Sequence, residues 1–336
     1  MEDNKDQKNE ARESYLDIAK GIGIILVILG HIDIGMANTW IYSFDLPLFF
    51  VVSGICFHYR ENFTEYLLKR LRRCLLPYAF FGIVIALVES RTGYLYETGL
   101  KTNFLRLIKQ ERYSTLWFLA TLMLASIIFY LIVRLCRQKP WPVLIISVVL
   151  GAVFVYLDQN HIRALYWNLD TAFIVLAFMA VGYFIKNSYG LLDRMLSAAR
   201  IKKAGLIVIF FVLNALFYVL NLVISHTSLE MYWNSYGCYP IMLICAISGS
   251  LFAILLSSTI KFSPLETLGR NSMTYFALHQ SVVLWPLTLL FRKIGFITFK
   301  DGINNIIAKA VLFVLILIIC TVIDKIIRST KLRVIL

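Results

Sequence analysis

Four ionisable residues, Asp17, Lys20, His31 and Asp33, lie in the first long apolar stretch of the chain, SYLDIAKGIGIILVILGHIDIG. Lys20 and His31 are eleven residues apart, close to three helical turns, which places both on one face and about 16 Å apart along the axis. Asp17 precedes Lys20 by one turn, where opposite charges can neutralise each other. Because ionisable groups at membrane depth are costly, this pattern predicts a functional site. The alternatives are an interfacial ion pair at Asp17 and Lys20, and a structural, hydrogen-bonded His31.

The composition excludes an ordinary soluble protein. Of 336 residues, 59% are hydrophobic and 16% charged, whereas a soluble domain carries about 25% charged residues. The formal charge of the chain is +13. In a membrane protein, an excess of lysine and arginine usually collects in cytoplasmic loops, so this charge does not indicate a nucleic-acid partner. The six cysteines are scattered without a CxxC pair, so neither a disulfide nor a metal site is predicted.

Apolar stretches of about 20 residues, the length that spans a bilayer, predict an all-α integral membrane protein. The chain is expected to be one membrane domain over 16–327, with polar tails at 1–15 and 328–336, and transfer is expected to need no further domain. Ten helices are predicted, near 16–36, 41–59, 74–90, 115–133, 141–157, 171–185, 205–224, 238–260, 272–291 and 305–327.

The distribution of lysine and arginine predicts that both termini are cytoplasmic. With the N-terminus inside, the inner segments hold 22 of these residues and the outer segments hold 9, in line with the positive-inside rule. The 91–114 segment, with five of the outer positives, is the weak point of this assignment. As the longest outer loop, it is also a candidate cover for an acceptor site.

Four segments in order, YLDIAKGIGIILVILGH, IYSFDLPLFFVVSG, KRLRRCLLPY and LWFL, resemble the membrane-bound type-3 acyltransferase family. The similarity is greatest to its sugar O-acetylases, including fucose 4-O-acetylase-like proteins. The resemblance implies ten helices with both termini inside. It also implies transfer of an acyl group, with acetyl preferred and succinyl possible, from cytoplasmic acyl-CoA to a sugar hydroxyl.

Lys20 and His31 match the first-helix motif of that family, a basic residue and a histidine separated by ten residues. The resemblance implies that His31 is catalytic, supported by Lys20 and Asp17. A histidine can take the proton of an acceptor hydroxyl or carry the acyl group briefly as an acyl-imidazole. The sequence leaves both roles open.

Arg70 and Arg73 match a cytoplasmic RxxR motif of the family. Guanidinium groups three residues apart lie on one side of a helical turn and can fork onto phosphate oxygens. Together with Lys20 they are predicted to bind acyl-CoA. Acyl-CoA, acetyl-CoA in the first instance, is expected as a co-substrate, and no tightly bound cofactor is expected. Basic clusters beside a spanning helix are also ordinary topology signals and lipid contacts.

Five further residues are expected to bind the acceptor or support the site. Asp45 stands where many relatives have a histidine, and its carboxylate is a candidate ligand for a sugar hydroxyl or a solvated interfacial group. Trp117 matches a family position, although tryptophan is common in interfacial belts. The others match a ninth-helix pattern, LGRNSMTYFALHQ, and are Asn271, Ser272 and His279.

The resulting prediction is an enzyme of the cytoplasmic membrane that acts on an envelope glycan, a lipid-linked sugar or an exopolysaccharide unit, with membrane lipids around it. A transporter is the main alternative, because intramembrane charges also mark substrate and proton paths. A membrane sensor or scaffold without chemistry is a third alternative.

Overall fold

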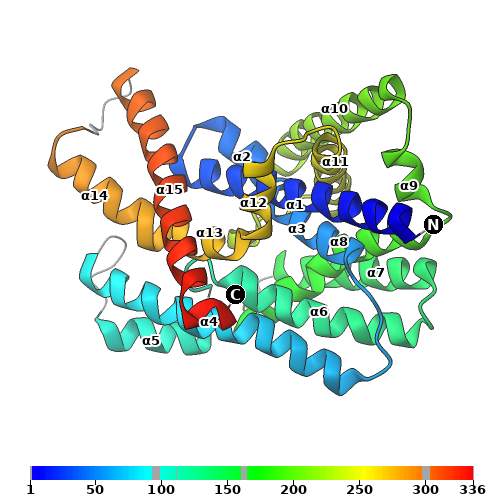
Figure 1. Ribbon diagram of the computed structural model, residues 1–336, viewed down its shortest axis with the longest axis horizontal. Helices are drawn as coiled ribbons and strands as arrows, with labels where there is room; N and C mark the ends of the chain where they lie inside the picture. The colour runs from blue at the N-terminus through cyan, green and yellow to red at the C-terminus, as the bar shows by residue number, and fades with distance from the viewer. Residues whose placement is uncertain (1, 93–98, 111, 160–164, 297–302, 336) are drawn as a thin grey trace.

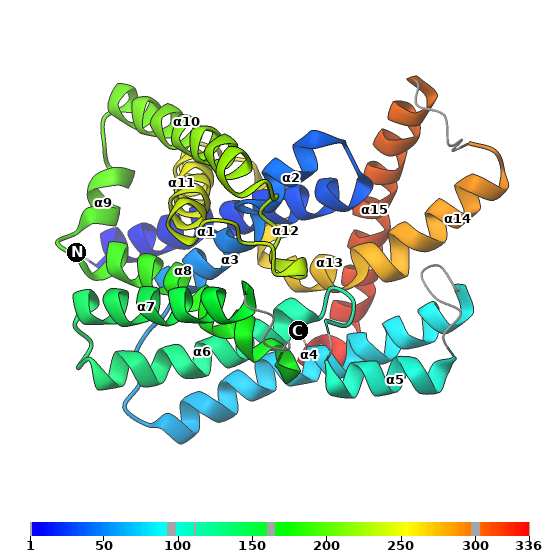
Figure 2. The same ribbon diagram turned by 180° about the vertical axis from the view of Figure 1, so that it is seen from behind.

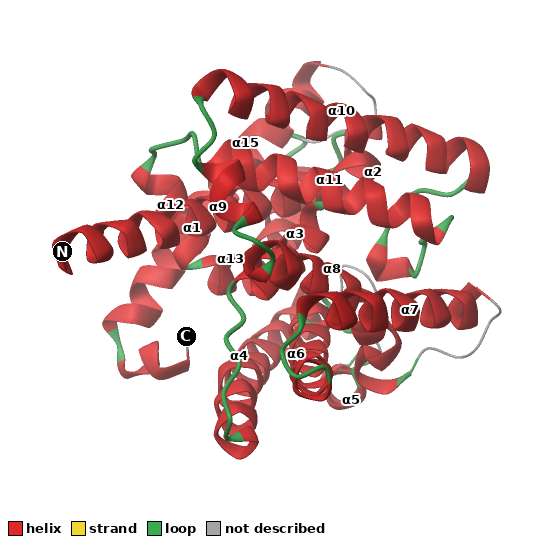
Figure 3. Cartoon of the chain, turned by 90° about the vertical axis from the view of Figure 1, so that its right-hand side faces the viewer, coloured by secondary structure: helices red, strands yellow, loops and turns green. Residues whose placement is uncertain are grey.

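A computed structural model describes residues 2–92, 99–110, 112–159, 165–296 and 303–335. Within these ranges the chain is a bundle of helices joined by loops, without a regular strand (Figure 3). Nine of its helical segments are long and apolar enough to cross a bilayer. These segments are Ser14–Ile32, Phe63–Thr92, Leu100–Leu135, Pro140–Gln159, Tyr166–Asn187, Arg200–Ser225, Tyr239–Ser257, Ser272–Lys293 and Ile306–Ser329. The protein is therefore a multi-pass membrane protein, as the sequence predicts.

The long helices carry the predicted spans. They are α1 (Glu2–Ile32), α4 (Phe63–Thr92), α6 (Trp117–Leu135), α7 (Pro140–Gln159), α8 (Leu169–Asn187), α10 (Arg200–Ser225), α11 (Tyr239–Ser257) and α15 (Ile303–Ser329). Helix α1 begins within the segment predicted as a polar tail, and α4 begins eleven residues before the predicted start. The longer α4 places Arg70 and Arg73 on a helix.

Shorter helices connect or interrupt the spans. They are α2 (Met36–Tyr42), α3 (Asp45–Ile55), α5 (Leu100–Lys109), α9 (Leu191–Leu196), α12 (Ser263–Arg270), α13 (Ser272–Leu278) and α14 (Trp285–Lys293). A π-helical turn, His279–Leu284, joins α13 to α14. Helices α5 and α14 lie toward the same end of the long axis of the molecule (Figures 1 and 2).

The prediction of one continuous helix over 41–59 is wrong, because the chain breaks between α2 and α3. Phe44 has φ −147° and ψ −10°, outside the helical region. The break is held by Asn214 of α10, whose Oδ1 accepts from Trp40 Nε1 (2.7 Å) and whose Nδ2 donates to Ser43 Oγ (3.4 Å). The break turns the start of α3, with Asp45, toward the end of α1.

Helix α3 lies at the centre of the bundle against α1, α8 and α11 (Figure 1). Its close approach to α8 requires glycine, since a Cβ on Gly54 would lie 1.9 Å from the carbonyl oxygen of Met179. Small residues at such crossings let spanning helices pack backbone to backbone. Because α3 is apolar around its circumference and almost fully buried, it forms the support for the polar residues at its N-terminal end.

Burial differs between the spans as expected for a bundle in lipid. Most of α6 and α8 is buried within the protein, whereas α7, α10 and α15 expose most of their apolar side chains. Figure 2 shows α10 and α15 at the edge of the bundle. These three helices therefore present the surface that faces the hydrocarbon.

Candidate active site

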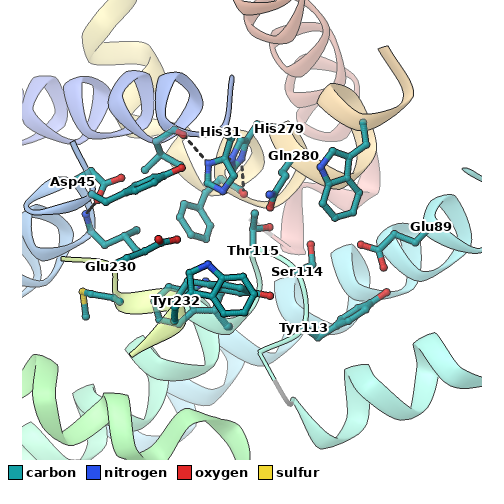
Figure 4. Close-up of a pocket in the computed structure, with 18 of the residues that line it drawn as sticks. His31, Asp45, Glu89, Tyr113, Ser114, Thr115, Glu230, Tyr232, His279 and Gln280 are labelled. Carbon is teal, nitrogen blue, oxygen red and sulfur yellow. Dashed lines mark hydrogen bonds between the residues drawn. The ribbon is translucent and has the colours of Figure 1, made fainter. Parts of the chain in front are cut away.

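A cavity of about 390 Å³ lies at the end of α1 that carries His31 (Figure 4). Its walls come from α1, the α2–α3 break, α4, α5, the segment before α6, the 226–238 loop and the α13–α14 region. It is lined by Val27, His31, Tyr42, Asp45, Leu46, Glu89, Arg106, Tyr113, Ser114, Thr115, Trp117, Glu230, Met231, Tyr232, Trp233, Phe276, His279, Gln280 and Trp285. Segments far apart in sequence thus form one polar and aromatic chamber.

Two histidines from different helices meet in this cavity. His279 Nε2 is 3.4 Å from His31 Nδ1, and the two ring centroids are 4.9 Å apart at an interplanar angle of 77°. His279 is fully buried. Catalytic hydrogen bonds are often long before substrate binds, so this spacing fits a working pair.

The surrounding carbonyl groups assign the tautomers of the pair. His279 Nδ1 lies 2.9 Å from Tyr275 O and 3.0 Å from Phe276 O, so this nitrogen carries the proton and donates it. His279 Nε2 is then an acceptor. His31 Nδ1, 2.8 Å from Val27 O, must donate to that carbonyl and to His279. The unprotonated atom of neutral His31 is Nε2, which has no hydrogen-bond partner among the described residues.

Local structure positions both histidines. His31 is in the last turn of α1. In the same turn, the Gly30 carbonyl accepts hydrogen bonds from Asn38 Nδ2 (2.7 Å) and Tyr42 OH (2.5 Å). These two side chains of α2 cap the helix end that carries His31. His279 begins the π-helical turn, an irregularity that is frequent at functional sites.

One side of the cavity contains a hydrogen-bonded carboxylate, Glu89. Ser281 Oγ donates to Glu89 Oε1 (2.9 Å), and Ser114 Oγ is 2.7 Å from Ser281 Oγ. Since the proton of Ser281 is used toward Glu89, Ser114 donates to Ser281. The Arg106 guanidinium lies 5.5 Å from the ring centroid of Tyr113 on the same side. This arrangement provides hydroxyl groups and an aromatic face beside the Glu89 carboxylate.

The opposite side contains Asp45 and Glu230 (Figure 4). Asp45 is 2% exposed, and its Oδ1 accepts from Leu46 N at 2.6 Å. Glu230 is in the 226–238 loop, and burial raises the pKa of its carboxyl above the usual range. Tyr42, the last residue of α2, also lines the cavity, with its ring centroid 6.3 Å from the His31 imidazole.

Two loops that cover the cavity are tied to each other. Arg112 donates to the carbonyl oxygen of Tyr232, and Tyr232 OH donates to Arg112 O at 3.1 Å. Arg112 also pairs with Asp170 at 3.5 Å, and Asn234 Nδ2 donates to Asp170 at 3.3 Å. The described parts of the 91–114 segment include the cavity residues Arg106, Tyr113 and Ser114, and residues 93–98 and 111 lie outside the described residues.

Of the residues singled out from sequence, four line the cavity, namely His31, Asp45, Trp117 and His279. Trp117 is 5% exposed and contacts Tyr232 at 6.1 Å between ring centroids, so it faces the protein and not a lipid belt. Asn271 and Ser272 lie at the junction of α12 and α13 and do not line the cavity.

Asp17 and Lys20 lie toward the other end of α1. Lys20 Nζ is 2.5 Å from Asp17 Oδ1, and Arg270 Nε is 3.4 Å from Asp17 Oδ2. Glu266 completes the group through Arg270 (2.6 Å). Helix α12 approaches α1 so closely here that a Cβ on Gly269 would lie 1.7 Å from Asp17 O. The pairing of Asp17 with Lys20 is present, and both are separated from the histidine pair along α1.

Arg70 and Arg73 lie on α4, away from the lining of the cavity. Arg70 is half-buried, with its guanidinium 5.7 Å from the ring centroid of Tyr66, and Arg73 is exposed. The two arginines are three residues apart on one helix, as the predicted donor site requires.

Sequence reasoning missed most of the cavity. Glu89 and Gln280 carried a usable signal, because the first is an ionisable residue in an apolar helix and the second directly follows His279. The others are in loops or short helices without periodicity that would indicate their direction. They include Arg106, Tyr113, Ser114, Thr115, Glu230, Tyr232, Trp233 and Trp285.

Comparison with known proteins identifies the family. A family described as an acyltransferase domain matches residues 13–325, nearly the whole chain. The chain belongs to the type-3 acyltransferase family. This membership makes the protein an acyltransferase and favours the enzyme over the transporter and the sensor.

A curated relative adds a partial match. The nodulation protein NolL of Mesorhizobium japonicum is 29% identical over 145 residues, which are 39% of this chain and 38% of the relative. The match thus spans well under half of that relative's length. No solved structure matches this acyltransferase significantly.

Proposed function

We propose that this acyltransferase moves an acyl group, acetyl in the first instance, from cytoplasmic acyl-CoA to a hydroxyl of an envelope or exopolysaccharide sugar. The observation that carries the proposal is the unprotonated Nε2 of His31 in a cavity lined by aromatic rings and carboxylates. Aromatic faces suit the apolar faces of sugar rings, and carboxylates accept hydrogen bonds from sugar hydroxyls.

In the proposed reaction, His31 Nε2 takes the proton of the acceptor hydroxyl as its oxygen attacks the thioester carbonyl carbon. The carbon–sulfur bond then breaks, and the thiolate that leaves takes the proton from His31. Both acceptors of the His31 Nδ1–H, Val27 O and His279 Nε2, stabilise the imidazolium that forms between these steps. An acyl-imidazole on His31 is the alternative route, in which the same nitrogen attacks first.

Gln280 supports the same step. Its side chain lines the cavity next to His279, and an amide N–H is a suitable donor for the oxyanion of a tetrahedral intermediate. We assign it this role because Ser114 and Thr115 already donate, to Ser281 and to Ala277 O respectively.

A coenzyme A thioester as the donor fits the separation between Lys20 and His31 along α1. If the donor phosphates lie near the Lys20 end, the thioester must extend about 16 Å along the helix to reach His31. Coenzyme A has a long flexible arm between its phosphates and its thiol, which meets this requirement. Arg70 and Arg73, on the predicted cytoplasmic part of α4, are proposed to bind the phosphates, with Lys20 in a supporting role.

The test compares glycans from cells that express wild-type protein with those from cells that lack it or carry His31→Gln. The proposal expects an acyl-sized mass on one envelope or secreted glycan only with the wild-type protein. Identical glycan masses in all three strains, with the protein present in the membrane, would contradict the proposed function.

A further inference from the structure

Asp45 and Glu230 lie on the same side of the His31 ring (Figure 4). Asp45 accepts one backbone hydrogen bond, from Leu46 N. In the part of the chain that the structure describes, the Glu230 carboxylate makes no hydrogen bond or ion pair with protein. Both side chains line the cavity, so their free acceptor positions are available to a bound molecule.

The charge of the cavity is unbalanced on this side. Asp45, Glu89 and Glu230 are the carboxylates of the lining, and Arg106 is its one lysine or arginine among the described residues. Arg106 lies over Tyr113, on the side of Glu89. His279 is neutral in this pattern, because its Nε2 accepts from His31. No described lysine or arginine of the lining lies beside Asp45 and Glu230.

The loop that carries Glu230 has a defined position. Glu230 N donates to Ser235 O (2.8 Å), and Ser235 N donates to Glu230 O (3.0 Å), which closes a tight hairpin. Asn234, within that hairpin, donates to Asp158 at 2.7 Å, and Arg112 donates to the carbonyl of Tyr232. The Glu230 carboxylate is therefore held over the cavity by contacts that do not involve its own side chain.

We propose that the acceptor is a sugar unit without negative charge, and that Glu230 is the residue that determines this specificity. This inference rests on the proposed function and names the substrate class of the same site. Hydroxyls next to the reacting one donate to Asp45 and Glu230, while the reacting hydroxyl donates to His31 Nε2. An acceptor with a carboxylate or phosphate at those positions is repelled and lacks the protons that the two carboxylates need.

The physical basis is that an ionised carboxylate only accepts hydrogen bonds. It therefore recognises hydroxyl groups directly. Like charges brought together in a desolvated site are an effective means of rejecting wrong partners. A site that hydrogen-bonds a substrate hydroxyl also discriminates strongly against analogues without it.

The experiment uses detergent-purified full-length protein with acetyl-CoA and matched acceptors. The acceptors are methyl glycosides of common neutral hexoses, 6-deoxyhexoses and N-acetylhexosamines, together with the corresponding methyl hexuronides. The measured quantity is the ratio of kcat/KM for the best neutral sugar to kcat/KM for the best uronide. We expect a ratio of about 100 or more for the wild-type protein.

Two variants at position 230 separate charge from structure. Glu230→Gln keeps the size of the side chain and hydrogen-bonding oxygen but removes the charge. It should lower the ratio about tenfold, mainly through better use of the uronide. Glu230→Ala should raise KM for the neutral sugar about tenfold, since the hydrogen bond is lost. Glu61→Gln is the matched control, because Glu61 is an exposed glutamate that does not line the cavity. Its ratio should equal that of the wild-type protein.

The outcomes distinguish this inference from the proposed function. Equal use of neutral sugars and uronides by wild-type protein, or an unchanged ratio in Glu230→Gln, overturns the specificity assignment and leaves sugar acylation in place. If no sugar of either kind increases acetyl-CoA consumption, the carbohydrate function is overturned and this inference with it.

Discussion

His279 Nε2 lies 3.4 Å from His31 Nδ1, and the neighbouring carbonyl groups leave His31 Nε2 as the unprotonated atom of the pair. The two residues are 248 positions apart in the chain. The irregular backbone at His279 and the capped end of α1 bring them together. In the proposed reaction, His279 positions His31, and His31 acts on the acceptor.

The first prediction concerns His279. His279→Gln should lower kcat by up to about 100-fold, because the His31 ring loses an acceptor that fixes its orientation. KM for the acyl donor should change little, since His279 is expected to act through His31. Steady-state kinetics with purified protein separate the two constants.

The control for this variant is His226→Asn, at an exposed position with φ 52°, a conformation that asparagine tolerates. It should leave both constants unchanged. A His279→Gln protein that is folded and as active as the wild type would contradict the positioning role.

The second prediction concerns Arg70 and Arg73. If they bind donor phosphates, replacing either with Lys should raise the donor KM by about tenfold, because the planar fork is lost. Replacing both with Ala should raise it further. Arg72→Lys is the control, since Arg72 is exposed on the same helical turn but outside the RxxR pair. Unchanged acetyl-CoA affinity of the double Ala variant would assign the arginines to topology alone.

The third prediction concerns the contact between the two covering loops. Arg112→Gln removes the ion pair with Asp170 and weakens the contact with Tyr232, so stability should fall by about 1–3 kcal/mol. The acceptor KM should rise more than the donor KM, because these loops surround the proposed acceptor side of the cavity.

Thermal unfolding and steady-state kinetics check this expectation. Arg91→Gln is a suitable comparison, since Arg91 is an exposed arginine in the last turn of α4. Equal stability and equal acceptor KM in Arg112→Gln and wild-type protein would show that the loop contact contributes neither to stability nor to acceptor binding.

The fourth prediction concerns topology. Reporter fusions at the C-terminus should be cytoplasmic, and fusions within the 91–114 segment should be on the opposite side, because 22 of the loop and tail cations lie inside in this orientation. The predicted topology requires the α2–α3 segment, residues 36–55, to cross the membrane despite the break between the two helices. A C-terminal reporter outside the cell would contradict an even number of crossings.

The positions of the spans could be predicted from the sequence, because length and hydropathy decide which segments fit a bilayer. The helical face shared by Lys20 and His31 was also predictable, since it depends only on the period of one helix. The break at Phe44 was not, because it depends on side chains such as Asn38 and Asn214, which bind backbone and side-chain groups of distant elements.

Within the site, His31 and Asp45 could be found because ionisable residues in apolar segments are conspicuous. Glu230 and Arg106 could not be placed at the cavity, because both belong to connecting segments whose direction is set by tertiary contacts. The contact of His279 with His31 was also outside the reach of sequence periodicity, since it depends on how α1 and α13 pack and on the π-helical turn.

The most direct test of the catalytic assignment is acyl transfer from acetyl-CoA to the native glycan by purified wild-type, His31→Gln and His31→Ala proteins, with thermal stability recorded alongside. Gln can form hydrogen bonds but cannot take a proton, so both variants should lose about 10² to 10⁴ in rate while remaining folded. Transfer by folded His31→Gln near the wild-type rate would contradict His31 as the catalytic base.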